Sequence, residues 1–397
     1  MELDITPWLN MALRWLHFIT GIAWIGSSFY FVWLDNNLEE PKEKKKGMSG
    51  ELWSVHGGGF YHKQKYAVAP EQMPENLHWF KWEAYFTWMS GFALLALTYY
   101  YGAELFLIDK SKADLGQWQA IGISLGFIMG GWVLYDGLCR SPLGTNNKAL
   151  GVVWFAILTA AAYGLTQIFS DRAAFLHVGA IAGTAMAFNV FMVIIPNQKK
   201  VVAALIAGEE PDPRLGKIGK QRSLHNNYMT LPVLLLMISN HYPMVFSNPY
   251  NWVVLAGLAL VGILIRHYFN LKNSGISSPA LPVAAGALFI AIMVFAASME
   301  ARKRAEFGDV KGSFTEVSAL ITKHCVSCHS ARPNHEAFDE APAGVKFDTA
   351  AEILQAVPRI MEQAVTSDIM PLGNETGMTD ADRALIGQWI KDGAKAH

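Results

Sequence analysis

The sequence predicts an all-α fold: an eight-span transmembrane helical domain followed by a small helical domain. Two observations support it. The 397 residues are 52% hydrophobic and only 16% charged, and the apolar side chains concentrate before residue 300. The remaining residues are more polar, and they hold two of the three cysteines. We expect the lipid bilayer around the first part and no nucleic acid as a partner.

Eight apolar stretches are long enough to cross a hydrocarbon core of roughly 30 Å, which takes about 20 helical residues. They lie near 8–33, 82–102, 117–138, 149–169, 174–196, 224–242, 252–270 and 279–298. Pro232 interrupts the sixth, and Arg266 and His267 stand at the end of the seventh. Buried helices of a soluble protein would not explain so many runs. We therefore expect a membrane domain over 1–300, a linker over 301–309 and a separate domain over 310–397.

The basic residues predict the orientation. Lysine and arginine gather after the first span (Lys42, Lys44, Lys45, Lys46, Lys63, Lys65, Lys81) and after the fifth (Lys199, Lys200, Arg214, Lys217, Lys220, Arg222). Loops on the opposite side carry only Lys110, Lys112 and Arg172. Basic loops stay in the cytoplasm. This pattern predicts a bacterial inner membrane protein with both termini, and hence the C-terminal domain, in the periplasm.

The membrane domain also resembles a unit of four helices repeated twice. Leu16-His17 matches Leu176-His177, and the segment 85–87 matches 228–230. An even number of spans in each unit predicts a parallel 4+4 repeat with its pseudo-axis along the membrane normal. In this register Glu83 corresponds to Asn226.

The strongest motif is Cys325-Val326-Ser327-Cys328-His329, the pattern of a c-type haem attachment site. Cys325 and Cys328 are spaced to form thioether bonds to the haem, and His329 follows as an axial ligand of the iron. A redox dithiol would not need the histidine. Half of a zinc site would need two further ligands, which are hard to find nearby.

A sixth iron ligand is expected downstream, and Met370 stands there before Pro371 on a loop. Met361 and Met378 are its rivals. With apolar residues at helical spacing on both sides and a capping-box pattern at 379–382, the region resembles a small class I cytochrome c domain. That resemblance implies one covalent haem c and electron transfer.

Two intramembrane histidines allow two interpretations. His17 and His177 are each followed by small residues at helical spacing. Close helix packing would explain the small residues, with each histidine bonded to a neighbouring carbonyl. Alternatively, the two imidazoles would hold a haem b iron between them.

The basic side of the membrane holds the other candidate residues. His56 precedes three glycines, which indicate a tight turn or a close backbone approach, with no strand before them. Glu83 opens an apolar span, where a carboxylate needs a partner or a task. Trp82, Tyr85, Asn226, Asn227 and Thr230 would complete a polar pocket for a planar ligand; their aromatic members would also suit an interfacial belt.

Several long strings carry a family resemblance: WSVHGGGFY at 53–61, LHWFKWEAYFTW at 77–88, HVGA at 177–180 through NV at 189–190, IPNQ at 195–198 and HNNYMT at 225–230. They are similar to those of the bacterial membrane-bound, cytochrome c-fused urate oxidases. The resemblance spans essentially the whole chain. It implies urate oxidation to 5-hydroxyisourate in purine breakdown, with electrons passing through the cytochrome to a respiratory cytochrome c oxidase. Hydrogen peroxide is then not a product.

The resemblance does not identify the catalytic residues, so we infer candidates from the chemistry of urate. Glu83 or His56 would serve as the base, and Lys81 would hold the anion. Thr87, Thr230 and the asparagines would bind its N–H and C=O groups, and Trp82 or Tyr85 would stack on its faces. Electrons from a cytoplasmic site would have to cross the membrane, which favours a buried haem. A site on the periplasmic side would need none.

Two other functions remain open from the sequence. The spans would also suit a haem b subunit that exchanges electrons between quinol and cytochrome c. A transporter with a tethered cytochrome is the third alternative, because a parallel repeat is common in that class.

Overall fold

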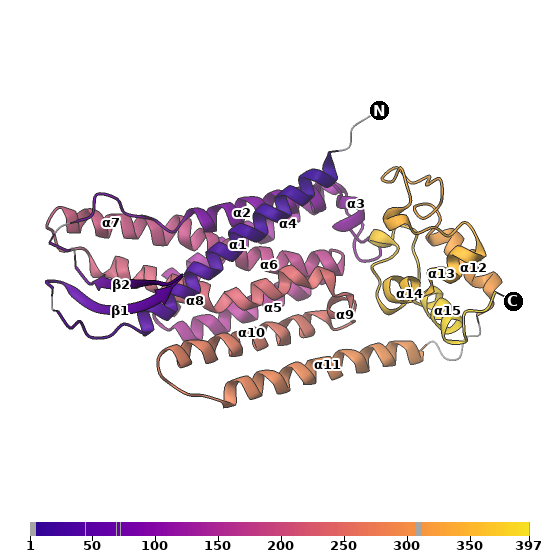
Figure 1. The fold of residues 1–397 in the computed structure, drawn as a ribbon. Coiled ribbons are helices and arrows are strands. Elements are labelled where there is room, and N and C mark those ends of the chain that lie inside the picture. The colour runs from indigo at the N-terminus through magenta and orange to yellow at the C-terminus, as the bar shows by residue number, and fades with distance from the viewer. Residues whose placement is uncertain (1–4, 44, 69, 72, 307–311, 397) are drawn as a thin grey trace.

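The computed structural model describes residues 5–396, apart from 44, 69, 72 and 307–311. It consists of an elongated helical bundle and a smaller helical C-terminal unit at one end of it (Figure 1). The β-hairpin and α7 lie at the opposite end of the bundle (Figure 1). The two basic segments thus share one end and the C-terminal unit occupies the other, which is the arrangement that the charge pattern predicts.

The long helices of the bundle are α1 (Thr6–Asn36), α2 (Trp82–Leu95), α4 (Gln117–Arg140), α5 (Asn147–Thr166), α6 (Asp171–Phe188), α7 (Ile195–Ile206), α8 (Pro213–Ile238), α10 (Asn251–Asn273) and α11 (Ala280–Glu306). The π-helix η1 (Ala96–Tyr100) extends α2, and the π-helix η3 (Asn189–Ile194) joins α6 to α7. Shorter elements complete it: α3 (Ala103–Phe106), η2 (Pro142–Thr145), η4 (Ser239–His241) and α9 (Pro243–Phe246).

Six helices in the described ranges are long and apolar enough to cross a membrane: 6–36, 117–140, 147–166, 171–206, 251–273 and 280–299. The other two predicted spans are also helical. The first of them is a 14-residue α2 that continues as a π-helix, and α8 begins with the polar segment 213–223. The count of eight spans and the 4+4 repeat therefore stay predictions.

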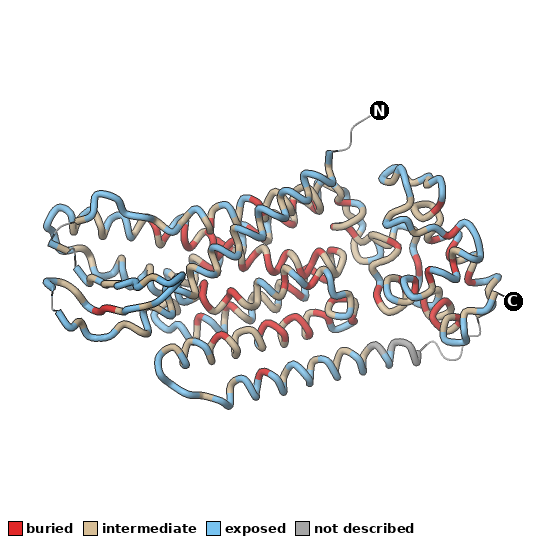
Figure 2. Tube along the Cα trace, viewed as in Figure 1, coloured by how far each residue is buried: buried red, intermediate tan, exposed pale blue. Residues whose placement is uncertain are grey.

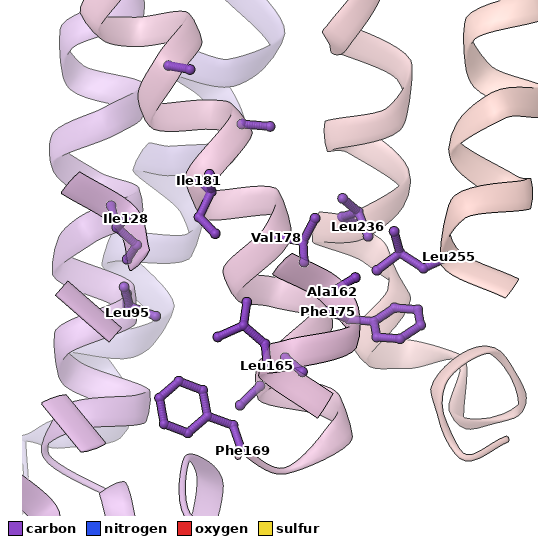
Figure 3. Close-up of a cluster of buried hydrophobic side chains, with 14 of the residues drawn as sticks. Leu95, Ile128, Ala162, Leu165, Phe169, Phe175, Val178, Ile181, Leu236 and Leu255 are labelled. Atoms are coloured by element: carbon purple, nitrogen blue, oxygen red, sulfur yellow. The ribbon is translucent and has the colours of Figure 1, made fainter. Parts of the chain in front are cut away.

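Helix α6 lies at the centre of the bundle, and most of its residues are buried (Figure 2). Small side chains allow this position. A Cβ at Gly179 would lie 3.1 Å from the Cβ of Leu236 on α8, and one at Gly131 on α4 would lie 2.5 Å from Ile181. The apolar side chains around α6 form the main core, which includes Leu95, Ile128, Ala162, Leu165, Phe169, Phe175, Val178, Ile181, Leu236 and Leu255 (Figure 3). Helices α1 and α11 are largely exposed, which suits contact with lipid.

A β-hairpin corrects the all-α prediction. Strands β1 (Met48–His56) and β2 (Gly59–Tyr66) pair antiparallel, with His56 opposite Gly59. Gly57 and Gly58 form the two-residue turn with φ of +59° and +79°, values typical of a type I′ hairpin turn. The tight turn was predicted, but the strand before it was not. The aromatic residues of these strands are largely exposed, so they lack the alternation of buried and exposed positions that identifies a half-buried strand.

The C-terminal unit has its own hydrophobic core. Its elements are α12 (Phe314–His324), η5 (Pro342–Gly344), α13 (Ala350–Gln355), α14 (Val357–Ile360), η6 (Met361–Thr366), η7 (Leu372–Asn374) and α15 (Asp380–Lys391). Val317 and Ile321 of α12 pack with Ile386 and Trp389 of α15. The predicted capping box at Thr379 and Asp382 begins α15. The expected linker is helical up to residue 306, and 307–309 lie outside the described residues.

The C-terminal unit contacts the bundle through η7, which packs on α3. Gly373 of η7 has a φ of +59°, and a Cβ there would lie 2.6 Å from the Glu104 carbonyl oxygen. A cavity of about 440 Å³ lies beside this contact, and residues from both parts line it, including Lys112, Arg172 and Arg383.

Candidate functional site

The haem-attachment motif begins where α12 ends. Cys325 is the C-cap residue, and its amide donates to the Ile321 carbonyl oxygen at 2.8 Å. The turn continues with a 2.9 Å bond from the His329 amide to the Cys325 carbonyl oxygen. Both thiols are free, and burial raises the pKa of the Cys325 thiol to about 12.

The His329 imidazole is oriented as metal-bound histidines usually are. Its Nδ1–H donates to the Val345 carbonyl oxygen at 3.0 Å, which leaves the Nε2 lone pair free. Burial lowers the pKa of His329, and this favours the neutral form that binds metals. These two cysteines and this histidine therefore fit a covalently held haem. The parts of the chain that the structure describes contain no group of three or more His, Cys, Asp or Glu residues placed to hold a metal ion.

The three candidate methionines differ in their surroundings. Met378 is buried in the hydrophobic core of the C-terminal unit, at 4% exposure. Met370 is half-buried on a loop that is fixed through its backbone. Its amide donates to the Gln363 carbonyl oxygen, and Arg383 donates to its carbonyl oxygen at 2.7 Å. Met361 is also half-buried, in η6. The fixed loop favours Met370 as the axial ligand, which stays a prediction.

His17 and His177 make separate contacts. The His17 Nδ1–H donates to the Thr87 carbonyl oxygen of α2 at 2.9 Å. His177 is fully buried; its Nδ1–H donates to the Ala173 carbonyl oxygen at 2.7 Å, and its Nε2 accepts from the Ser124 hydroxyl at 2.7 Å. Neither nitrogen of His177 is free in this arrangement, so the pair does not fit a haem iron between two imidazoles. Haem b stays a prediction from the sequence, and the contacts agree with the packing interpretation.

The structure brings only part of the predicted substrate pocket together. The Lys81 Nζ lies 5.2 Å from the Trp82 ring centroid, and Trp82 contacts the Tyr85 ring. Glu83 begins α2, and its Oε2 is buried without a hydrogen-bond partner among the described residues. The Glu83 carboxylate therefore has no partner for this oxygen among the described residues, and it stays a candidate for binding or catalysis.

His56 and the two threonines do not join this group. His56 is exposed beside the hairpin turn, and no described hydrogen bond or ring contact links it to Glu83. The hydroxyls of Thr87 and Thr230 donate to the carbonyl oxygens of Glu83 and Asn226, four residues earlier in their own helices. Hydroxyls engaged in this way are less available to a ligand.

Asn226 and Asn227 contact different neighbours. The Asn226 Oδ1 accepts from Asn189 at the start of the π-helix η3, and its Nδ2 donates to the Met186 carbonyl oxygen. The Asn227 Oδ1 accepts from Arg266 and Asn270 of α10. Helix α8 thus presents one asparagine to α6 and the next to α10, rather than both to one pocket.

Two buried arginines are the functional candidates that the sequence analysis did not single out. Arg222 donates to Asn189 at 3.0 Å and to Asp136 at 2.7 Å, so its charge is paired. Arg266 donates to Asn227 at 2.9 Å, and its guanidinium lies 3.8 Å from the Phe29 ring centroid. The available signal was a charged residue within or beside an apolar span, which is a functional candidate by default.

A family model described as urate oxidase N-terminal matches residues 4–297. The match covers the bundle and ends before the C-terminal unit. No curated protein and no solved structure matches the chain.

Proposed function

The chain belongs to the urate oxidase N-terminal family, which indicates an oxidoreductase that acts on urate, and we propose that it passes the electrons of urate to a haem c in its own C-terminal unit. Because the family match lies within the bundle, urate would bind and react there. The product would be 5-hydroxyisourate, formed in purine breakdown.

The observation that carries the electron-transfer proposal is the geometry of His329. Its Nδ1–H bond to Val345 leaves Nε2 free beside two unpaired cysteines in the attachment pattern. Cys325 and Cys328 would hold the haem covalently, and His329 and Met370 would hold its iron. When bound, the haem supplies a one-electron acceptor. Conversion of urate and one water to 5-hydroxyisourate releases two electrons and two protons, so two transfers complete each turnover.

The bundle residues would prepare urate for this oxidation. Glu83, whose Oε2 is unpaired among the described residues, would accept a proton from urate or from the attacking water. Lys81 would attract the anion, and Trp82 and Tyr85 would cover its faces. These roles rest on side-chain chemistry and on the contacts that join Lys81, Trp82 and Tyr85 at the start of α2.

The cellular arrangement follows from the two ends of the bundle. With the basic hairpin end in the cytoplasm, the protein would lie in the bacterial inner membrane and the C-terminal unit would face the periplasm. Electrons would leave to a soluble cytochrome c or to a cytochrome c oxidase, without formation of hydrogen peroxide.

Adding urate to the purified, oxidised protein without oxygen tests this proposal. Urate should produce the absorbance spectrum of reduced haem c, and the solution should contain no hydrogen peroxide. Reduction by a quinol analogue but not by urate would support the quinol–cytochrome c alternative instead. Uptake of urate into liposomes without any change in the haem spectrum would support a transporter.

A further inference from the structure

Three unpaired polar atoms are buried together between α8 and α10. They are the Nδ2 of Asn227, an Nη2 of Arg266 and the Oδ1 of Asn270, and none has a hydrogen-bond partner among the described residues. Asn227 is 2% exposed and Arg266 is 4% exposed. Buried polar groups in proteins are nearly always hydrogen-bonded, so three neighbouring exceptions require an explanation.

The chemistry of Arg266 determines which atoms are unpaired. A guanidinium N–H can only donate, so the Asn227 atom 2.9 Å from its Nε must be the amide oxygen. That oxygen also receives the Asn270 contact at 2.8 Å, so the Asn270 atom facing it must be the amide nitrogen. The remaining atoms are therefore a donor on Asn227, a charged donor on Arg266 and an acceptor on Asn270.

The charge of Arg266 is also uncompensated. Of the carboxylates that the structure describes, none lies within ion-pair distance of its guanidinium. The ring of Phe29 on α1 covers one side of it at 3.8 Å. An aromatic face offsets only part of the free energy of burying a cation in a membrane domain. An anion that reaches the buried, unpaired Nη2 would complete the arrangement.

From these contacts we infer that Asn227, Arg266 and Asn270 form the recognition site for the urate anion, an inference that rests on the proposed function. Urate is a planar anion whose edges carry C=O and N–H groups side by side. Its oxygens complement the donors of Asn227 and Arg266, and an N–H complements the acceptor of Asn270. Arg266 of α10 would then hold the bound anion, and Lys81 at the start of α2 would attract it to the bundle.

The backbone of the two helices supports a fixed site. A Cβ at Gly262 on α10 would lie 3.2 Å from Pro232 of α8, so the two helices approach closely one turn from Arg266. Rigid helices hold recognition groups in place better than loops do.

Direct binding of urate tests the inference without relying on haem reduction. Equilibrium dialysis of radiolabelled urate would compare the full-length wild-type protein with Arg266→Gln and Asn227→Asp. The second variant keeps the oxygen that Arg266 and Asn270 use, replaces the unpaired donor with an acceptor, and adds a negative charge beside Arg266 that would compete with the urate anion. Loss of a hydrogen bond to a charged group weakens binding about ten- to hundredfold, and we expect that change in both variants. Lys272→Gln removes an exposed charge from the same helix and should bind like wild type.

The outcomes separate the site from the function. Unchanged urate affinity in Asn227→Asp and Arg266→Gln would overturn the site, even if urate still reduces haem c in the wild type. Absence of urate binding to the wild type would overturn it as well. A third outcome is that both variants lose urate binding while urate fails to reduce haem c in the wild type. This outcome would support the site and refute the electron transfer. If Arg266→Gln does not fold, as judged by the circular dichroism of its helices, the binding result for Asn227→Asp decides.

Discussion

Gly373 of the C-terminal unit lies against Glu104 of the bundle so closely that a Cβ on the glycine would stand 2.6 Å from the glutamate carbonyl oxygen. Backbone atoms cannot move aside as a flexible side chain can. Any side chain at position 373 therefore pushes the C-terminal unit away from α3.

Gly373→Ala should slow the reduction of haem c by urate about ten- to hundredfold, the effect of a displacement near 1 Å in a positioned reaction. The dithionite-reduced spectrum should not change. Gly377→Ala is the matched control, because Gly377 has a similar φ of +64° on the same loop and a Cβ there has no neighbour within 4 Å. Stopped-flow absorbance measures the rate of haem c reduction in both variants. Equal rates would show that the contact between Gly373 and Glu104 does not affect electron transfer.

Replacing Cys325 and Cys328 with alanine should remove all covalent haem, because each thiol forms one of the two thioether bonds. In-gel haem staining after denaturation measures this directly. Cys139→Ala removes the third free cysteine, which lies in α4, and should stain like wild type. Haem that remains attached in the double variant would refute the attachment site.

Met370→Ala should lower the reduction potential of the haem by about 0.1 V or more, within the ~0.8 V range that axial ligands span. Met378→Ala should leave the potential in place and destabilise the C-terminal unit by about 2–5 kcal/mol, because it creates a cavity in the core. Redox titration and thermal unfolding separate the two effects. A shifted potential in Met378→Ala or Met361→Ala, with none in Met370→Ala, would reassign the ligand.

Glu83→Gln should reduce the turnover of urate by about 10²–10⁴, the usual contribution of a general base, while reduction of the haem by dithionite stays normal. Oxygen consumption in membranes supplied with urate measures turnover. Glu209→Gln changes an exposed carboxylate in a loop and should have no effect. Normal turnover in Glu83→Gln would exclude this residue as the base.

Acidified acetone releases non-covalent haem and leaves haem c on the protein. Because both ring nitrogens of His177 already have partners, we expect no haem in the extract. A b-type haem that disappears from the extract in His177→Ala would contradict this expectation and restore the bis-imidazole interpretation.

The sequence predicted a mostly helical chain, because long apolar runs and their periodicity are local features. Apolar runs of sufficient length predict a membrane helix without any tertiary information. The capping box at Thr379 and the turn at Gly57 are local patterns for the same reason. The hairpin strands were missed because Trp53, Phe60 and Tyr61 are exposed while Glu51 is buried. Apolar and polar residues therefore do not alternate as they do in a strand with one apolar buried face.

The candidate site was harder to predict, because partners depend on the rotation of each helix about its axis. Asn226 and Asn227 are neighbours in sequence, yet they contact α6 and α10 respectively. The sequence shows Arg266 only as a residue at the end of a span. Its contact with Phe29 depends on how α1 packs beside α10, which no local pattern predicts. In contrast, the residues of the haem motif are consecutive, so a single turn of chain brings them together.

The position of Arg266 also has an electrical consequence. It lies in the last third of α10, toward the end of the bundle that is remote from the C-terminal unit (Figure 1). In the proposed arrangement an electron that moves from urate at this site to the haem would cross much of the membrane, and it would need a redox group between the two ends other than a haem at His17 and His177. A full crossing is worth about 2.3 kcal/mol per 100 mV of membrane potential. With the cytoplasm negative, the potential drives that electron outward. Urate oxidation by this protein would then discharge the membrane, and an energised membrane would accelerate it.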